Sequence, residues 1–465
     1  MDPSALEAAL APPSLDVPDP DPPQPLGEWR SGGLPFSLGA ELELQLVNGE
    51  TGHLISLAPA LLAALHAAFP DDTARFQREL MENTVEVTSS VCRSVSDLAE
   101  NLRGYIGRAV SMAALHGATV ISAGSHPVAD PYEQRITDAP RMTALLNEFG
   151  RGVREALTFG LHVHVGVDDG ADAMAAGNVL LQHVPQLLAL STSSPFWDGR
   201  DSGLSSSRCP QYTSFGNTGI PPIDMRTMSD YRRHYQELIE AGTIRSNSDI
   251  HYVVRPSPHQ GTIEVRIADA TPTLREAMAI AAYVQCLVAD VPNDPAHRHP
   301  VSRTDLVANK SAVVNRSVAA NVRDLDGTVR PVWYCIERDI ERLRPVAERL
   351  GCSSQLEDNL KILNVWGPSS ERQRVVCSLA PDASGAPLST PVPKPHERLD
   401  PHRAAHVLRS LNREFLADSP QPPQVLSELR QRVARDRGPE RAALAAADPL
   451  RGADLGRRLM MTVEL

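Results

Sequence analysis

Three apolar stretches of this chain are each interrupted by two polar or charged side chains that lie two residues apart. The three pairs are Glu41 with Glu43, His162 with His164, and Glu264 with Arg266. A period of two is the period of a β-strand, so both members of a pair project from one face of a predicted strand. Burying charges on such a face is costly unless they are paired or bind a metal or ligand. The pattern therefore predicts a polar sheet face that binds something charged.

The rest of the pattern alternates strands with helices. Strands are predicted over residues 37–47, 51–57, 83–88, 118–123, 158–167, 251–256 and 262–269, with a tight turn at Asn48-Gly49. Helices are predicted over 58–68, 94–116, 172–191, 274–289, 303–322 and 332–350, and Pro185 is expected to kink or break the third. Several strands are apolar on one face only. This favours an α+β fold, an antiparallel sheet with helices packed on one face and the other face open to a ligand.

Composition divides the chain into four parts. Residues 1–33 are rich in Pro and Asp and are expected to form a disordered extension. Residues 34–385 are the expected main domain, in which 192–226 is a long Gly-, Ser- and Pro-rich loop of the kind that often carries function. A Pro-rich linker over 386–399 leads to a helical C-terminal extension over 400–465.

Charge and cysteine content narrow the class of protein. The net charge of −12 argues against general binding to nucleic acid or to anionic membranes. No stretch approaches the roughly 20 apolar residues of a membrane span, and the N-terminus lacks the basic and apolar regions of a signal peptide. The six cysteines form no CxxC motif and no zinc-finger spacing. We therefore expect reduced thiols and a cytoplasmic location.

The paired side chains have both functional and structural interpretations. Glu41 and Glu43 lie about 7 Å apart on a strand, a spacing from which two carboxylates can bind one or two Mg²⁺, but an exposed strand face also accommodates Glu. His162 and His164 can meet one metal or ligand, or play a structural role. Their flanking glycines allow close backbone approach, which favours a site.

The arginines, and the glutamates beside them, also have a ligand-binding and a structural interpretation. Arg266, and Arg255 in the preceding strand, present a planar fork that suits carboxylate and phosphate oxygens. Glu264 and Glu86 are candidate metal ligands, and the alternative for each is an ion pair with a neighbouring arginine. Each structural interpretation is reasonable alone, but four charged strand faces would need four separate explanations.

Several common catalytic signatures are missing from the sequence. There is no GxxxxGK[ST] loop, no GxGxxG between a strand and a helix, and no GxSxG elbow. A nucleotide would therefore be held by metal ions and arginines rather than by a phosphate-cradling loop.

Several motifs resemble, in fixed order, the bacterial carboxylate–amine ligases of the type 2 glutamate–cysteine ligase-like family. LGAELELQLV is similar to the family opening G-[VI]-E-x-E-[FL]. It is followed by ENTVEVTSSVC, ISAGSHPVADPYEQR, LTFGLHVHVGVDD, LLALSTSSPFWDGRDSG, VRPSPHQGTIEVRIADA and ERQR. The resemblance covers about Phe36 to Leu379. It implies a glutamine-synthetase-like catalytic domain over 34–385 and an ATP- and Mg²⁺-dependent enzyme that forms an amide through an acyl phosphate.

The resemblance also implies roles for individual residues. Glu41, Glu43, Glu86 and Glu264 look like Mg²⁺ ligands, and His162 and His164 resemble histidines beside the nucleotide phosphates or the substrate carboxylate. Arg255 and Arg266 look like clamps for phosphate or carboxylate, and Arg200 and Arg208 in the long loop are candidate ligand contacts. The implied partners are a small carboxylate and an amine, with amino acids favoured, and a second copy of the chain in a homodimer.

Two further hypotheses stay open at this level. The loop after PFWDGRDSG reads LSSSRCPQYTSFGNTG, which departs from the family, so the chain could be a nucleotide-binding or scaffold member that has lost activity. The His pair could instead hold a transition metal in a hydrolase, which would require second-shell partners for both imidazoles.

Overall fold

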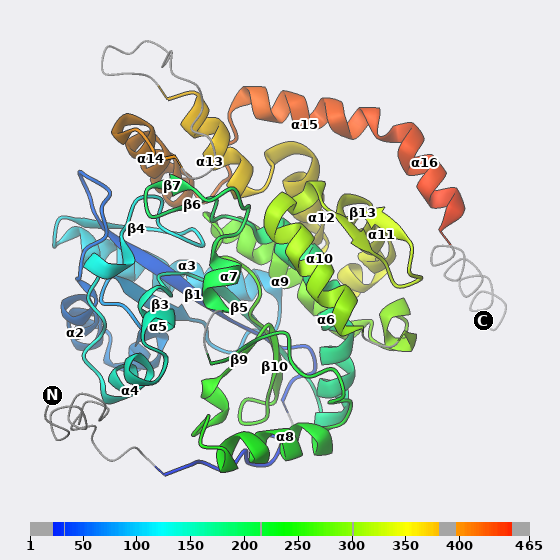
Figure 1. Cartoon of the computed structure of the whole chain (residues 1–465), viewed down its shortest axis with the longest axis horizontal. Coiled ribbons are helices and arrows are strands. Elements are labelled where there is room, and N and C mark those ends of the chain that lie inside the picture. The colour runs from blue at the N-terminus through cyan, green and yellow to red at the C-terminus, as the bar shows by residue number, and fades with distance from the viewer. Residues whose placement is uncertain (1–21, 32, 214–215, 300–301, 381–396, 449–465) are drawn as a thin grey trace, which may run out of the picture.

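The computed structural model describes residues 22–31, 33–213, 216–299, 302–380 and 397–448 (Figure 1). Its centre is a seven-stranded sheet in the order β10-β11-β5-β1-β3-β2, with β4 paired to β1, and all pairs are antiparallel. These strands are β1 (Leu38–Asn48), β2 (Phe76–Arg78), β3 (Thr84–Thr88), β4 (Ala118–Ile121), β5 (Leu161–Gly166), β10 (Val254–Ser257) and β11 (Thr262–Val265). The two strands that carry the Glu pair and the His pair are therefore neighbours.

Helices cover one face of the sheet. The helix α3 (Val95–Ala114) packs on β1 and β4, α9 (Leu274–Ala289) packs on β5, and α6 (Gly170–Ser191) packs on β10 and β11. Leu42 and Leu44 of β1 are fully buried beneath these helices, and the glutamates that alternate with them point to the opposite face. The predicted α+β design, with helices on one face of an antiparallel sheet, is confirmed.

The remaining helices and strands surround this core. The helices are α2 (Ala58–Ala68), α4 (Pro140–Phe149), α5 (Arg151–Arg154), α7 (Arg208–Tyr212), α8 (Met228–Glu240), α10 (Arg303–Arg316), α11 (Val332–Leu350), α12 (Ser353–Lys361), α13 (Ser369–Ser378), α14 (Pro401–Ala417), α15 (Gln424–Asp436) and α16 (Gly438–Ala447). The short strands are β6 (Phe196–Trp197), β7 (Arg200–Asp201), β8 (Asn217–Gly219), β9 (Ile250–Tyr252), β12 (Asn321–Arg323) and β13 (Val329–Pro331). In the C-terminal part, α14 packs against α13 and β4. No helix within these ranges is long and apolar enough to cross a bilayer.

Several predicted elements differ from the structure. Residues 51–57 form a single bridge, between Val47 and Leu54, instead of a strand. The helix predicted over 303–322 ends at Arg316, because Ser317 takes a φ of 46° and its hydroxyl donates to the carbonyl of Ala189 at 2.9 Å. The helix α6 continues through Pro185 without a break.

The termini of the chain also differ in part from the sequence-based expectation. Residues 22–31, which we placed in a disordered extension, follow an extended path held by hydrogen bonds to the main domain, with Leu26 and Trp29 half-buried. The rest of that extension, the linker up to residue 396 and the residues after 448 lie outside the described ranges.

The helical layer contains a buried histidine whose charge predicts a pH-dependent stability. His183 of α6 lies between Asp294 and Asp339, with an imidazole nitrogen 3.1 Å from an oxygen of each. Arg342 and the hydroxyl of Tyr283 bind the same two carboxylates. Burial alone would lower the pKa of His183, but the two aspartates outweigh it and raise the pKa to about 9.

The His183 cluster should therefore stabilise the fold most below about pH 6.5, where the imidazolium also exists in the unfolded chain. This contribution, on the order of 3 kcal/mol, is lost as the pH rises through about 9. We expect the free energy of unfolding to fall between pH 7 and pH 9.5, and His183→Gln to flatten that dependence. Urea denaturation at a series of pH values checks this. If the unfolding free energy of His183→Gln fell with pH as steeply as that of the wild type, the role assigned to His183 would be contradicted.

Candidate active site

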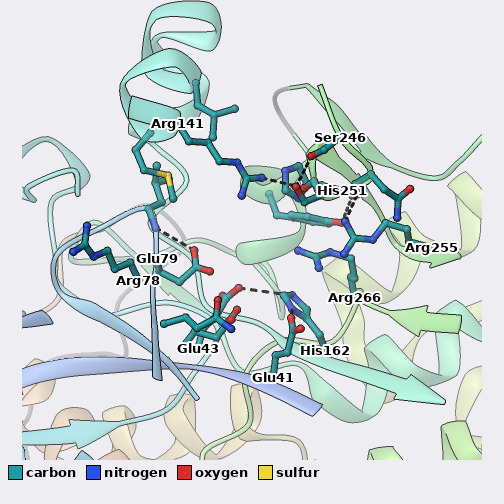
Figure 2. A pocket seen from close by; sticks show the side chains of 18 of the residues that line it. Glu41, Glu43, Arg78, Glu79, Arg141, His162, Ser246, His251, Arg255 and Arg266 are labelled. Carbon is teal, nitrogen blue, oxygen red and sulfur yellow. Dashed lines mark hydrogen bonds and ion pairs between the residues drawn. The ribbon is translucent and has the colours of Figure 1, made fainter. Parts of the chain in front are cut away.

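The open face of the sheet brings the predicted Glu and His pairs together. The β1–β5 register sets Glu41 opposite His162, and the β1–β3 register sets Glu43 opposite Glu86. Because directly opposed residues share a face, all four side chains point to the same side of the sheet. Figure 2 shows Glu41, Glu43 and His162 rising from adjacent strands into one cavity.

Glu41 is held between the two histidines. His162 Nδ1 lies 3.0 Å from Glu41 Oε2, and His164 Nε2 lies 3.4 Å from Glu41 Oε1. The other nitrogen of His164, Nδ1, lies 3.0 Å from the hydroxyl of Thr262. Burial raises the pKa of Glu41, but the bonds from both imidazoles outweigh it and hold the pKa well below its usual range. Burial and Arg266 lower the pKa of His162 to about 4, so this imidazole is neutral at pH 7.

The third predicted pair extends the same face. Glu264 lies opposite His164 in the β5–β11 register, and both predicted arginines bind it. Arg255 Nε donates to Glu264 Oε2 at 2.7 Å, and the guanidinium of Arg266 pairs with the other carboxylate oxygen. Burial raises the pKa of Glu264, but Arg255 and Arg266 outweigh it and lower the pKa. The ion pair that we left open as an alternative is thus present, and both arginines also line the cavity.

Three carboxylates at the other side of the cavity have a different environment. One oxygen of each of Glu43, Glu79 and Glu86 lies within 4.8 Å of the others, and no Arg or Lys forms an ion pair with them in the described ranges. Burial and Glu79 raise the pKa of Glu43 to about 7. Burial and the neighbouring glutamates hold the pKa of Glu86 well above its usual range. Buried carboxylates that repel one another need a cation to become ionised together.

The donor atoms fit hard divalent cations. Within the described residues, three groups of side chains place one donor atom each within 4.8 Å: Glu41, His164 and Glu264; Glu41, Glu86 and His162; and Glu43, Glu79 and Glu86. Carboxylate oxygens dominate all three groups, which is the donor type that Mg²⁺ prefers. His162 and His164 fall in different groups, so these groups do not include the shared two-histidine site that the hydrolase hypothesis requires.

Two cavities open over this face and meet at Glu41. The larger, of about 630 Å³, is lined by the carboxylates of Glu43, Glu79 and Glu86 and by Arg266. The smaller, of about 390 Å³, is lined by His164, by residues of β1 and by the exposed Val91. Glu41 lines both cavities. A ligand that extends from one cavity to the other would therefore pass over Glu41.

The two candidate arginines of the long loop take different positions. Arg208 of α7 is buried and lines the larger cavity, and its guanidinium donates to the carbonyls of Arg266 and Ile267 at 3.2 Å. It therefore supports the backbone that carries Arg266. Arg200 lies in β7, where it pairs with Trp197 and forms a bridge with Arg398, and it lines neither cavity. The structure thus separates Arg200 from the other candidates.

Sequence reasoning missed several residues of the larger cavity, among them Glu79, Arg141, Tyr212 and His251. Gln77 and Glu79 are two residues apart, the strand period, but only the β2–β3 register, which sets Gln77 opposite Glu86, places Glu79 near the other carboxylates. Arg141 comes from α4 and reaches across the cavity mouth (Figure 2). It bonds to Asp249 at 3.1 Å and to the Ser248 carbonyl. No local pattern connects residues so distant along the chain.

This site, a set of buried carboxylates, imidazoles and arginines on an open antiparallel sheet, is suited to a highly charged ligand. Comparison with known proteins identifies the class. Residues 37–377 match the model of glutamate–cysteine ligase family 2 (GCS2). The "Putative glutamate--cysteine ligase 2-1" of Frankia casuarinae is 38% identical over 343 residues, which cover 73% of this chain and 89% of that protein. The "Putative glutamate--cysteine ligase 2" of Thermobifida fusca is 35% identical over 73% of this chain and 86% of that one.

The chain therefore belongs to glutamate–cysteine ligase family 2, a family of ATP-dependent carboxylate–amine ligases. The fold agrees with that assignment. The crystal structure of the glutamate–cysteine ligase of Francisella tularensis in complex with AMP matches with a TM-score of 0.56 at 13% identity, over 91% of this chain and 97% of that one. A bifunctional glutathione synthetase from Pasteurella multocida matches with a TM-score of 0.52 at 13% identity. That match covers 82% of this chain and 52% of the longer protein. The predicted family resemblance is confirmed.

Proposed function

We propose that this protein uses Mg²⁺ and ATP to join the carboxylate of one amino acid to the amine of another. The observation that carries the proposal is the group of Glu43, Glu79 and Glu86, one buried and two half-buried carboxylates without an Arg or Lys ion-pair partner in the described ranges. Membership of the ligase family supports the same reaction. An enzyme that handles the triphosphate of ATP needs such a cation site to compensate its charge.

In the proposed roles, three donor groups hold the cations. Glu43, Glu79 and Glu86 form one group, and Glu41 contributes to the two groups that contain His162 and His164. Bound Mg²⁺ would supply positive charge that neutralises the phosphate oxygens of ATP. His162 fits a ligand position, because burial and Arg266 lower its pKa and keep its imidazole neutral at pH 7.

The proposed reaction has two steps. A carboxylate oxygen of the acid attacks the γ-phosphorus of ATP, the bond to the β-phosphate oxygen breaks, and ADP leaves. The amine then attacks the carbonyl carbon of the acyl phosphate, loses a proton and displaces inorganic phosphate, which leaves the amide. Arg266, fixed by Glu264 and by the Arg208 contact to its carbonyl, is placed to stabilise charge on the transferred phosphoryl group.

The names of the relatives suggest glutamate as the acid and cysteine as the amine. The larger cavity has room for both beside the phosphates, and it presents Arg255, Arg266 and Tyr212 toward them. The smaller cavity, with the exposed side chains of Leu34 and Val91 on its wall, suits the base of the nucleotide. The homodimer implied by the family remains a prediction, which light scattering after size-exclusion chromatography can check.

The direct test is the release of ADP from Mg²⁺-ATP with L-glutamate and L-cysteine. We expect ADP and phosphate in equal amounts, and a product whose mass equals the sum of the two amino acids minus one water. Omission of either amino acid or of Mg²⁺ should reduce the rate to background. If a broad screen of acids and amines yields no ADP from folded protein that binds ATP, the hypothesis of an inactive nucleotide-binding member replaces this proposal.

Substitution of Arg266 separates its proposed catalytic role from a structural one. We expect Arg266→Ala to lower kcat by about 10²–10³ because a donor to the phosphoryl group is lost. The thermal unfolding midpoint should stay close to that of the wild type, because Glu264 keeps its bond to Arg255. ADP release and calorimetry measure the two effects. Normal turnover, or an unfolded variant, would instead favour the interpretation of Arg266 as a structural ion pair.

A further inference from the structure

The segment 22–31, which we call the N-terminal strap, runs across the rim of the site. It passes beside α8 and continues to the turn between β10 and β11 (Figure 1). The backbone of Gln24 bonds the Arg245 carbonyl at 2.7 Å and the hydroxyl of Tyr235 at 2.6 Å. Further along the strap, the indole of Trp29 donates to the Val167 carbonyl at 3.3 Å. The strap is therefore fixed at both ends.

The seat of the strap includes a close backbone contact. Arg30 donates its backbone N–H to the carbonyl of Pro258 at 2.9 Å. A Cβ atom at Gly261 would lie 2.2 Å from the Arg30 carbonyl oxygen, and Gly261 has a φ of +68°. Only glycine fits such an approach without strain. The β10–β11 turn thus has the shape needed to hold the strap at Arg30.

The strap contributes to both cavities, although it precedes the family-matched residues 37–377. Gln24, Pro25, Leu26 and Gly27 line the larger cavity, and Arg30 lines the smaller one together with Glu41 and His164. The wall of the site therefore includes a segment that the family match does not contain. A contact from this segment would be particular to this chain and to proteins that share the strap.

Arg30 is the charged residue of the strap at the smaller cavity. No side chain or carbonyl in the described ranges forms an ion pair or hydrogen bond with its guanidinium. The other arginine of that cavity, Arg75, donates to the Ser89 carbonyl at 2.6 Å. An arginine held at a cavity wall by its backbone, with its guanidinium unpaired, is available to an anionic ligand.

We propose that Arg30 is a nucleotide-binding residue, which contacts the α-phosphate of a nucleotide whose base occupies the smaller cavity. The inference rests on the proposed function, because that function names ATP as the nucleotide that the protein binds. It adds a binding residue outside the family-matched residues 37–377. The Trp29 contact of the strap and the close approach of Arg30 to Gly261 in the β10–β11 turn position Arg30 for this contact.

The test measures nucleotide binding rather than turnover. Isothermal titration of the full-length protein with AMP in EDTA gives Kd without catalysis, and titration with ATP and Mg²⁺ follows. We expect Arg30→Ala to raise both Kd values about three- to tenfold, because a charge-assisted contact is lost. Arg30→Lys should recover part of the affinity. Arg233→Ala, which removes an exposed arginine of α8 outside both cavities, should bind as the wild type does.

A second readout separates a charged contact from a structural effect. The Kd of the wild type for AMP should rise with NaCl concentration, and that dependence should be weaker in Arg30→Ala. Equal Kd values and equal salt dependence in wild type and variant would overturn the proposal. Nucleotide binding without ligation would remove the proposed function but leave this inference standing. A wild type that binds neither nucleotide would remove both.

Discussion

Replacing Glu43 by glutamine is expected to abolish ligation and to stabilise the cation-free protein. Glu43 shares a buried space with Glu79 and Glu86, and a cation can bind oxygens of all three. The amide keeps the shape of the side chain, and with its nitrogen turned away from Gly160 its oxygen can still accept the bond from the Gly160 N–H. The substitution removes a negative charge. That charge is needed when Mg²⁺-ATP is bound, and it repels Glu79 and Glu86 when no cation is present.

Two measurements check this expectation. Turnover of Glu43→Gln, followed as ADP release, should fall by about 10³, the upper end of the range found when charge-stabilising groups are removed from active sites. In EDTA, its thermal unfolding midpoint should exceed that of the wild type, and Mg²⁺ should raise it less. The control is Glu50→Gln, which changes an exposed glutamate just beyond β1 and should alter neither quantity. Wild-type turnover in Glu43→Gln would remove Glu43 from the site.

Arg372→Ala is expected to have the largest effect on stability. The side chain of Arg372 in α13 is 1% exposed and lies between two buried carboxylates. Its guanidinium donates to Glu276 of α9 at 3.0 Å and to Glu414 of α14 at 2.8 Å. Truncation leaves both carboxylates buried without their cation, and breaking a buried ion pair in this way costs about 3–5 kcal/mol.

Urea denaturation of Arg372→Ala measures this cost as a loss of unfolding free energy. The matched control is Arg103→Ala, which breaks the ion pair to Asp418 at the end of α14. Because 58% of the Arg103 side chain is exposed, that loss should stay below about 1 kcal/mol. A similar small loss in Arg372→Ala would show that the buried triad contributes little.

The Arg372 triad also bears on how the chain is organised. Arg372 lies within the family-matched residues 37–377, whereas Glu414 lies beyond them. The helix α14 additionally buries Val407 and Leu411 against side chains such as Phe196. The first helix of the C-terminal part is therefore packed into the ligase domain, and deletion of residues from 400 onward would expose both an apolar surface and an unpaired charge.

The sequence alone determined the sheet face of the site. Alternation of polar and apolar residues in 38–47, 159–167 and 261–269 is a local property, and burial of the apolar set leaves one orientation for the polar set. For this reason Glu41, Glu43, His162, His164 and Glu264 all appear on the expected face. The family motifs, in their fixed order, further indicated the ligase class that the comparisons confirmed.

The tertiary structure alone decided which distant segments complete the site. Glu79 joins the carboxylate cluster through the β2–β3 register, Arg208 supports Arg266 while Arg200 lines neither cavity, and the N-terminal strap brings Arg30 to the wall of the smaller cavity. These choices depend on strand register, on loop paths and on contacts between residues separated by up to hundreds of positions. A local pattern of hydrophobic and polar residues specifies which way a side chain faces, but not what lies opposite it.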